Sequence, residues 1–256
     1  MPTILQITDT HLRGSDEPIK GVAPLENLKR VLEAARDYCP NPALVVWTGD
    51  IADDESEGAY DKMREAVGDW YERSRWIPGN HDNRALMRAH LLNESTDDSS
   101  LLCFSEGVEG WHLLGLDTLV PGQTPGELRF SQWQSLHHSV NGEPILIFSH
   151  HPLALVHCNW MDDMGIQNRE VFDAMLLETS AICANFAGHV HSEYDGDWNG
   201  VRICTTPSTL FQFKREPDTI LIHPVPPGFR AIHLDGPTMH TEVIRLAESN
   251  YAIPTG

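Results

Sequence analysis

The stretch "TILQITDTH", residues 3–11, joins a short apolar segment to a polar end. Residues 3–8 are rich in β-branched and aliphatic side chains, which predicts a short buried strand. Asp9 and His11 follow at the carboxyl end of that strand. The same order, an apolar strand followed by Asp, Asn or His, recurs along the chain and predicts both the fold and the site.

Further apolar segments predict strands at residues 43–48, 75–78, 111–116 and 144–149. Two intervening segments have apolar residues at helical spacing. The first contains Leu25, Leu28, Val31, Leu32 and Ala35, and the second contains Tyr60, Met63, Ala66, Val67 and Trp70. Alternating strands and helices are typical of a layered α/β domain.

Helical patterns stop after residue 190, and the rest of the chain predicts strands. A hairpin is expected to turn at Asn199 and Gly200, and further strands are expected at 219–223, 228–234 and 239–246. With no repeat or linker, we expect one domain over residues 1–256. We expect residues 192–256 to complete a second sheet and the substrate site.

The charge and cysteine content narrow the functional classes. Thirty-seven acidic residues against eighteen Lys and Arg give a formal charge of −19, which disfavours nucleic acid and anionic membranes as partners. The opening residues have neither a basic segment nor a long apolar core, so we expect no signal peptide, and no apolar stretch is long enough to span a membrane. Five cysteines without a CxxC pair suit a reducing compartment. We therefore expect a soluble cytoplasmic protein, of an oligomeric state that the sequence does not predict.

Polar residues end five of the expected strands, and such ends share one edge of an α/β sheet. The second strand ends in Asp50, the third in Asn80 and His81, and the strand at 144–149 in "HHP" (His150, His151). A further apolar segment, residues 180–187, ends in "GHVH", residues 188–191. On extended backbone, His189 and His191 would project to the same side. The alternative for this motif alone is a pair of surface histidines.

These strand ends supply seven oxygen and nitrogen donors, which is too many for one metal ion. Two ions that share a bridging carboxylate account for the number, and such pairs are used in phosphoryl chemistry. The seven expected ligands are Asp9, His11, Asp50, Asn80, His150, His189 and His191.

The blocks "DTH…GD…GNHD…HHP…GHVH", which span residues 9–191, resemble the calcineurin-like metallophosphoesterases. The resemblance implies a four-layer α-β-β-α sandwich. It implies that Asp50 bridges two metal ions, that His151 is an outer neighbour, and that His81 contacts the phosphate and protonates the leaving oxygen. It assigns Asp9, His11 and His191 to one metal and Asn80, His150 and His189 to the other.

A resemblance over nearly the whole chain is to the bacterial 3′,5′-cyclic AMP phosphodiesterases, carried by "ILQITDTHL", "PGNHD", "HHPL…CNWMD", "DWNG", "TPST…QFK" and "PPGF". It implies hydrolysis of the small-molecule nucleotide 3′,5′-cyclic AMP to 5′-AMP, with iron, manganese or zinc in the site. A metal-bridging hydroxide would attack phosphorus. The substrate would contact His11, Asp50, Asn80, His81 and His191.

Three alternatives stay open at this point. The substrate could be another diester, such as a glycerophosphodiester or a 2′,3′-cyclic nucleotide, or a phosphomonoester. A protein serine/threonine phosphatase is disfavoured, because the chain has "GNHD" where that class has an Arg-bearing "GNHE" motif. A non-catalytic scaffold with this fold is disfavoured because all seven ligands are present.

Two further expectations concern the segment 197–214 and Asp82. Residues 197–214 would help to shape the substrate site, with Phe211 on the base face and Gln212 on the base edge. The hydroxyl groups of Thr205, Thr206, Ser208 and Thr209 are suited to the ribose; the alternative is that this segment only completes a sheet. We expect Asp82 to cap the helix that follows "GNHD".

Overall fold

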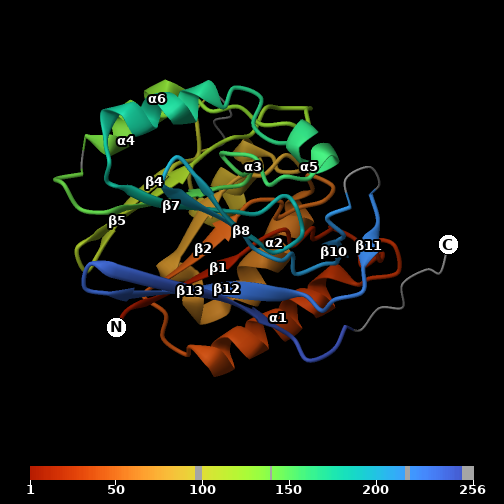
Figure 1. Ribbon diagram of the computed structural model, residues 1–256. Coiled ribbons are helices and arrows are strands. Elements are labelled where there is room, and N and C mark those ends of the chain that lie inside the picture. Colours follow the sequence, from red (N-terminus) through yellow and green to blue (C-terminus); the bar gives the residue numbers. More distant parts are fainter. Residues whose placement is uncertain (96–99, 139, 217–219, 250–256) are drawn as a thin grey trace.

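The computed structural model describes residues 1–95, 100–138, 140–216 and 220–249. Two sheets stack face to face, and helices cover their outer faces (Figure 1). The first sheet has the order β13-β12-β1-β2-β3. Its strands are β1 (Thr3–Ile7), β2 (Leu44–Thr48), β3 (Ser74–Ile77), β12 (Gly228–Asp235) and β13 (Thr238–Arg245).

The second sheet has the order β4-β5-β6-β7-β9-β8. Its strands are β4 (Phe104–Val108), β5 (Trp111–Leu116), β6 (Ile145–Ser149), β7 (Ile182–Ala187), β8 (Tyr194–Trp198) and β9 (Val201–Thr205). A separate pair is formed by β10 (Gln212–Phe213) and β11 (Ile222–His223). Strands β1, β2 and β3 run parallel, as do β5, β6, β7 and β9, so each group presents its carboxyl ends at one edge.

The core between the sheets is built from strand residues such as Ile4, Val46, Phe148 and Phe186. On the outside of the first sheet lie α1 (Pro24–Tyr38) and α2 (Glu57–Val67), and α4 (Phe130–His137) and α6 (Glu170–Glu178) cover the second. Apolar side chains on both faces of each sheet force this arrangement, because each face must be covered. The predicted four-layer α-β-β-α sandwich is confirmed.

The predicted helical faces are observed with one boundary change. The apolar residues predicted for the first helix pack inward from α1, except that Leu25 is only partly buried. The second helix ends at Val67, because Gly68 has φ +56 and starts the 3₁₀ turn η1 (Gly68–Arg73), which carries Trp70. The remaining short helical elements are α3 (Arg84–Met87), the π-helical turn η2 (Arg88–Leu92) and α5 (Asn159–Asp163).

The C-terminal part divides between the two sheets and does not complete only the second. The hairpin of β8 and β9 joins the second sheet, as predicted, whereas β12 pairs antiparallel with β1 in the first. On β12, Phe229 and Ala231 pack toward the helices and Ile232 packs between the sheets. With both faces apolar, β12 is buried inside a sheet. Of the predicted strand 219–223, Ile222 and His223 form β11, and Thr219 lies outside the described residues.

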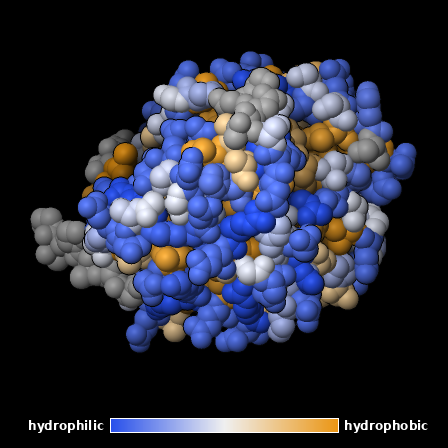
Figure 2. Space-filling model, turned by 180° about the vertical axis from the view of Figure 1, so that it is seen from behind, coloured by the Kyte–Doolittle hydropathy of each residue, from blue (hydrophilic) through white to orange (hydrophobic). Residues whose placement is uncertain are grey.

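The surface is predominantly polar. Figure 2 shows mostly hydrophilic side chains on one face of the molecule, with smaller hydrophobic areas scattered among them. This agrees with the excess of acidic residues in the sequence. In the part of the chain that the structure describes, no helix is both long and apolar enough to cross a membrane.

Candidate metal centre

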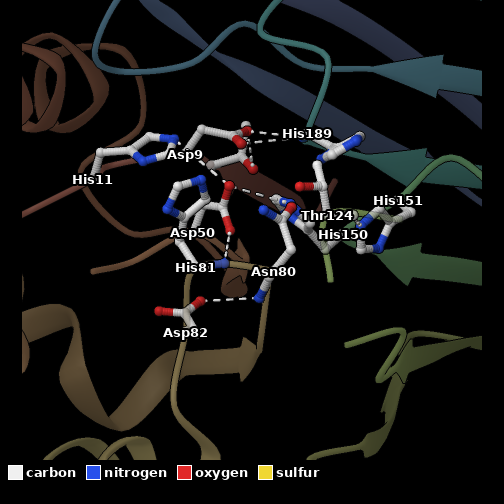
Figure 3. A network of polar contacts seen from close by, with 12 residues as sticks. Asp9, His11, Asp50, Asn80, His81, Asp82, Thr124, His150, His151 and His189 are labelled. Atoms are coloured by element: carbon white, nitrogen blue, oxygen red, sulfur yellow. Dashed lines mark hydrogen bonds and ion pairs between the residues drawn. The ribbon is translucent and has the colours of Figure 1, made fainter. Parts of the chain in front are cut away.

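The loops after β1, β2 and β3 of the first sheet meet the loops after β6 and β7 of the second, and all seven predicted ligands come together there (Figure 3). His191 Nε2 lies 3.3 Å from Asp9 Oδ1, and His150 Nε2 lies 3.2 Å from Asn80 Oδ1. The backbone N–H of His189 donates to the carboxylate of Asp9 at 3.1 Å. The two sheets thus bring residues 180 positions apart into one cluster.

Each of the four predicted histidine ligands has one ring nitrogen engaged by an oxygen that can only accept. That nitrogen must carry a proton, so when the ring is neutral the other nitrogen presents a lone pair. The engaged pairs are His11 Nδ1 with Asp53 Oδ1 (3.2 Å), His150 Nδ1 with Thr48 O (2.7 Å), His189 Nε2 with Met164 O (3.0 Å) and His191 Nδ1 with Phe211 O (2.9 Å).

The free nitrogens face one another in a way that calls for a cation. His11 Nε2 and His191 Nε2 are only 3.0 Å apart. Burial lowers the pKa of His11, more than the neighbouring carboxylates raise it, so its ring is neutral near pH 7. Two lone pairs at that distance repel, so either a proton or a metal ion must lie between the two nitrogens. Imidazole nitrogen together with carboxylate oxygen is a donor set that first-row metals accept, so the residues present fit a metal ion.

Asp50 lies between two groups of donors. Its Oδ2 is 3.6 Å from His11 Nε2 and 3.4 Å from His150 Nε2. His11 converges with Asp9 and His191, whereas His150 converges with Asp9 and Asp50. Asp50 is therefore placed where a carboxylate could bridge two ions.

The charge of the cluster attracts cations. Although burial opposes it, the carboxylate of Asp50 raises the pKa of His150 to about 9. Burial raises the pKa of Asp50, but the neighbouring histidines outweigh this effect and hold the pKa well below its usual value. Without a metal ion, a proton on His150 supplies part of the positive charge that these carboxylates require.

His151 is also in the cluster, but both of its ring nitrogens are used. Nε2 meets the carbonyl of Thr124 at 2.9 Å, and Nδ1 meets the hydroxyl of Thr118 at 2.8 Å. Burial, followed by the charge of His150, lowers the pKa of His151 to about 3. Its hydrogen bonds therefore leave no lone pair for a metal, which fits the position of an outer neighbour.

The backbone at the ligands differs from the extended form expected for "GHVH". Five of the seven predicted ligands have positive φ: Asp9, His11, Asp50, His189 and His191. Such conformations typically cost about 1–3 kcal/mol each for a non-glycine residue and cluster at functional sites. His189 and His191 thus approach the cluster from a tight loop after β7, not from one face of a strand.

Close approach of the loops also depends on glycine. A Cβ atom on Gly79 would overlap Oδ1 of Asp50 and lie 2.8 Å from Cε1 of His150. A Cβ on Gly188 would overlap the hydroxyl of Thr8 and lie 2.7 Å from Oδ2 of Asp9. The glycines that precede Asn80 and His189 therefore have a steric role.

His81 lies at the exposed rim of the cluster, where one of its ring nitrogens is within 4.8 Å of donor atoms of His11 and Asp50. Its side chain is 43% exposed, and its Nδ1 lies 4.0 Å from Asp53 Oδ1. Its backbone N–H donates to Asp50 Oδ1 at 2.9 Å, which holds the residue at the rim. The imidazole can reach a bound ligand from there, as a residue that acts on substrate requires.

The expectation that Asp82 caps a helix is wrong. Asn83 caps α3, by accepting from the N–H of Leu86. The carboxylate of Asp82 instead joins the loops after β2 and β3, and burial and the charge of Asp50 raise its pKa to about 6. It accepts from the N–H groups of Ile51, Ala52 and Gly79 and from the hydroxyl of Tyr60.

Most of the segment 197–214 supports the structure and does not line the site. Thr205, Thr206 and Ser208 are buried, and their hydroxyls bond to Ser192 O, Gln6 Oε1 and Asp9 O. The buried Gln212 donates to Ser208 O, and Thr209 is also buried. Phe211 is the member of the predicted set that reaches the cavity.

A cavity of about 240 Å³ opens over the cluster. It is lined by metal-cluster residues and His81, and also by residues that the sequence does not assign to the site, because no local pattern marks them. These residues include Ile19, Lys20, Asp53, Thr124, Trp160, Met164, Leu210 and Phe213.

Comparison with known proteins identifies the family. The family model described as calcineurin-like phosphoesterase matches residues 2–193, so the chain belongs to this family. It is 36% identical over 255 residues to the 3′,5′-cyclic adenosine monophosphate phosphodiesterase CpdA of Escherichia coli (strain K12), covering 97% of this chain and 91% of that protein. It is 29% identical to the 3′,5′-cyclic-nucleotide phosphodiesterase alr5338 of Nostoc sp., covering 99% and 96%.

The fold also matches solved structures. A dimetal phosphatase from Danio rerio superimposes with a TM-score of 0.68 at 16% identity, covering 96% of this chain and 97% of that one. At this identity the match concerns the fold, which is the metallophosphoesterase sandwich.

Proposed function

We propose that this chain is a phosphodiesterase that uses two metal ions to hydrolyse 3′,5′-cyclic AMP to 5′-AMP. The observation that supports the use of two metal ions is the position of Asp50 Oδ2, which lies within 3.6 Å of His11 Nε2 and of His150 Nε2, one from each group of donors. The choice of 3′,5′-cyclic AMP as substrate is supported by the relative from E. coli, which is similar over 97% of this chain. The cysteines, all free, favour a cytoplasmic location.

Two groups of side chains would hold the ions. One ion would be held by Asp9, His11 and His191. The other ion would be held by Asn80, His150 and His189, and Asp50 would bind both ions. Iron is the first choice because of the resemblance to the bacterial cyclic AMP phosphodiesterases, and imidazole nitrogen with hard oxygen also accepts the alternatives, manganese and zinc. When bound, the ions supply an activated water and neutralise charge on the phosphate.

The chain itself supplies orientation and a proton. Asp53, held by two hydrogen bonds from Arg13, keeps the Nδ1 proton of His11 directed away from the cluster. His81, at the rim, is placed to protonate the 3′-oxygen as it leaves. Together with His81, the substrate would contact His11, Asp50, Asn80 and His191.

The test is a substrate panel with metal-replete protein whose metal content has been measured. Cyclic AMP, 2′,3′-cyclic AMP, a glycerophosphodiester and a phosphomonoester are compared by kcat/KM, with product identity established by chromatography. We expect preferred hydrolysis of 3′,5′-cyclic AMP to 5′-AMP, lost on chelation. Preference for another member of the panel would overturn the substrate assignment. Full activity of metal-free protein would overturn the metal assignment.

A further inference from the structure

The cavity over the metal cluster has an apolar wall that phosphate chemistry does not require. The wall is formed by side chains from three separate segments. Its residues are Ile19, Trp160, Met164, Leu210, Phe211 and Phe213. A cavity that combines metal-binding groups with an apolar, partly aromatic lining suits a ligand that joins a phosphate to an aromatic ring.

The geometry points to Trp160 as the platform on which the nucleobase stacks, an inference that rests on the proposed function. Trp160 lies in α5, is half-buried and lines the cavity. Its indole Nε1 donates to the carbonyl of Glu216 at 2.9 Å. Because this donor is already used, Trp160 can offer a ligand its aromatic face but not its N–H group.

A short series of rings connects Trp160 to the metal cluster. Phe213 stacks on His191, with centroids 4.9 Å apart and planes at 28°. Trp160 stands nearly perpendicular to Phe213, at 5.5 Å and 87°. Phe213 therefore packs against both His191, a proposed metal-binding residue, and the indole of Trp160. These contacts fix the position of Trp160 relative to the metal cluster, where the phosphate would bind. The ribose would span the space between the two.

Stacking on an indole has a consequence for specificity. Every base has an aromatic face, so stacking recognises a base without distinguishing one base edge from another. Trp160 would thus separate cyclic nucleotides from diesters that lack a base, and it would contribute about equally to binding adenine and guanine nucleotides.

The experiment compares Trp160→Ala, Trp160→Phe and Trp198→Phe. Trp198 lies in β8, donates its Nε1 to Asp173 and does not line the cavity, so Trp198→Phe is the matched control. The substrates are 3′,5′-cyclic AMP, 3′,5′-cyclic GMP and the cyclic phosphate of propane-1,3-diol, which has the same six-membered phosphodiester ring without a nucleoside. Metal content is measured for every variant.

We expect Trp160→Ala to raise KM for each cyclic nucleotide that the wild type hydrolyses by at least about fivefold, the low end for loss of one stacked base. The increase should be the same for both nucleotides, with kcat, metal content and kcat/KM for the base-free diester little changed. Trp160→Phe should recover most of the loss, and Trp198→Phe should match the wild type. An equal loss on the base-free diester, or loss of metal, would overturn the role of Trp160.

Binding of 5′-AMP separates this inference from the proposed function. The chain has seven tryptophans. If 5′-AMP quenches tryptophan fluorescence in the wild type but not in Trp160→Phe, the quenching reports on Trp160 alone. If the wild type does not hydrolyse cyclic AMP, the proposed function fails, yet Trp160-dependent quenching would still support the platform. No such quenching at saturating 5′-AMP would overturn it.

Discussion

The backbone N–H of His81 donates to Oδ1 of Asp50 at 2.9 Å, whereas Oδ2 is the oxygen of this carboxylate that lies nearest to His11 Nε2 and His150 Nε2. The two oxygens have different tasks: one anchors the loop after β3, and the other is available to a cation. An amide cannot perform both tasks, because one of its two ends is a donor.

Replacing Asp50 with Asn therefore tests the bridging assignment. If the amide oxygen accepts from His81, the NH₂ group points at the site of the ions. We expect a loss of metal affinity beyond the roughly 10–100-fold typical of residues that only support a ligand, with a parallel fall in kcat. Metal titration and steady-state kinetics check this, with circular dichroism as the folding control. A variant that keeps two ions and wild-type turnover would contradict the bridge.

His81→Ala separates a role on the phosphate from a role on the metal. Because the imidazole of His81 is exposed at the rim, we expect metal content to be retained while kcat for cyclic AMP falls on the order of 10²–10⁴-fold. The loss should shrink for nitrophenyl esters, whose leaving groups need no proton. An equal loss on all substrates would indicate stabilisation of charge on the phosphate instead.

Gly79→Ala tests the steric role of the glycine before Asn80. The added Cβ would overlap Asp50 Oδ1, so the loops after β2 and β3 must move apart. We expect destabilisation of about 1–3 kcal/mol, the usual cost of overpacking, together with weaker metal binding. Gly107→Ala is the control, because a Cβ there meets nothing within 4 Å. If the two variants bind metal equally well, the close approach at Gly79 is not required.

The pH dependence of stability offers a test of His151. Its pKa is about 3 in the folded chain, against about 6.5 for an unperturbed histidine. The folded state keeps the ring neutral while the unfolded state binds a proton, so the stability that His151 contributes is present above pH 6.5 and is lost as the pH falls toward 3. The expected slope is about 1.4 kcal/mol per pH unit.

His151→Gln removes this titration. Urea unfolding of the metal-free protein is measured between pH 6.5 and 5. The free energy of unfolding should depend less steeply on pH in the variant, and the difference in slope should correspond to the uptake of about one proton. The buried His189, whose pKa is lowered by burial and then by the charge of His151, is present in both proteins, so the comparison measures His151 together with its effect on His189. Identical slopes would show that His151 is protonated in the folded chain.

Local pattern determined much of the architecture. The apolar segments at 3–8, 43–48 and 144–149 formed strands because each is bounded by polar or turn residues and can be buried on both faces. The ends of these strands, together with those of β3 and β7, carry the seven donors, and parallel strands of one sheet finish at the same edge. The assignment of these donors to metal ions stays a prediction, although the fold brings them together.

Only the tertiary structure decided how these donors are directed. The proton of each ring is placed by an oxygen remote in sequence, such as Phe211 O for His191 or Asp53 for His11, and no periodicity encodes such partners. The positive φ at Asp9, Asp50 and His189 likewise requires the surrounding loops to hold the strain. The same holds for the burial of β12 beside β1 and for Trp160 beside the metal cluster. A local pattern records whether a residue is buried, whereas contacts between distant segments decide what it touches.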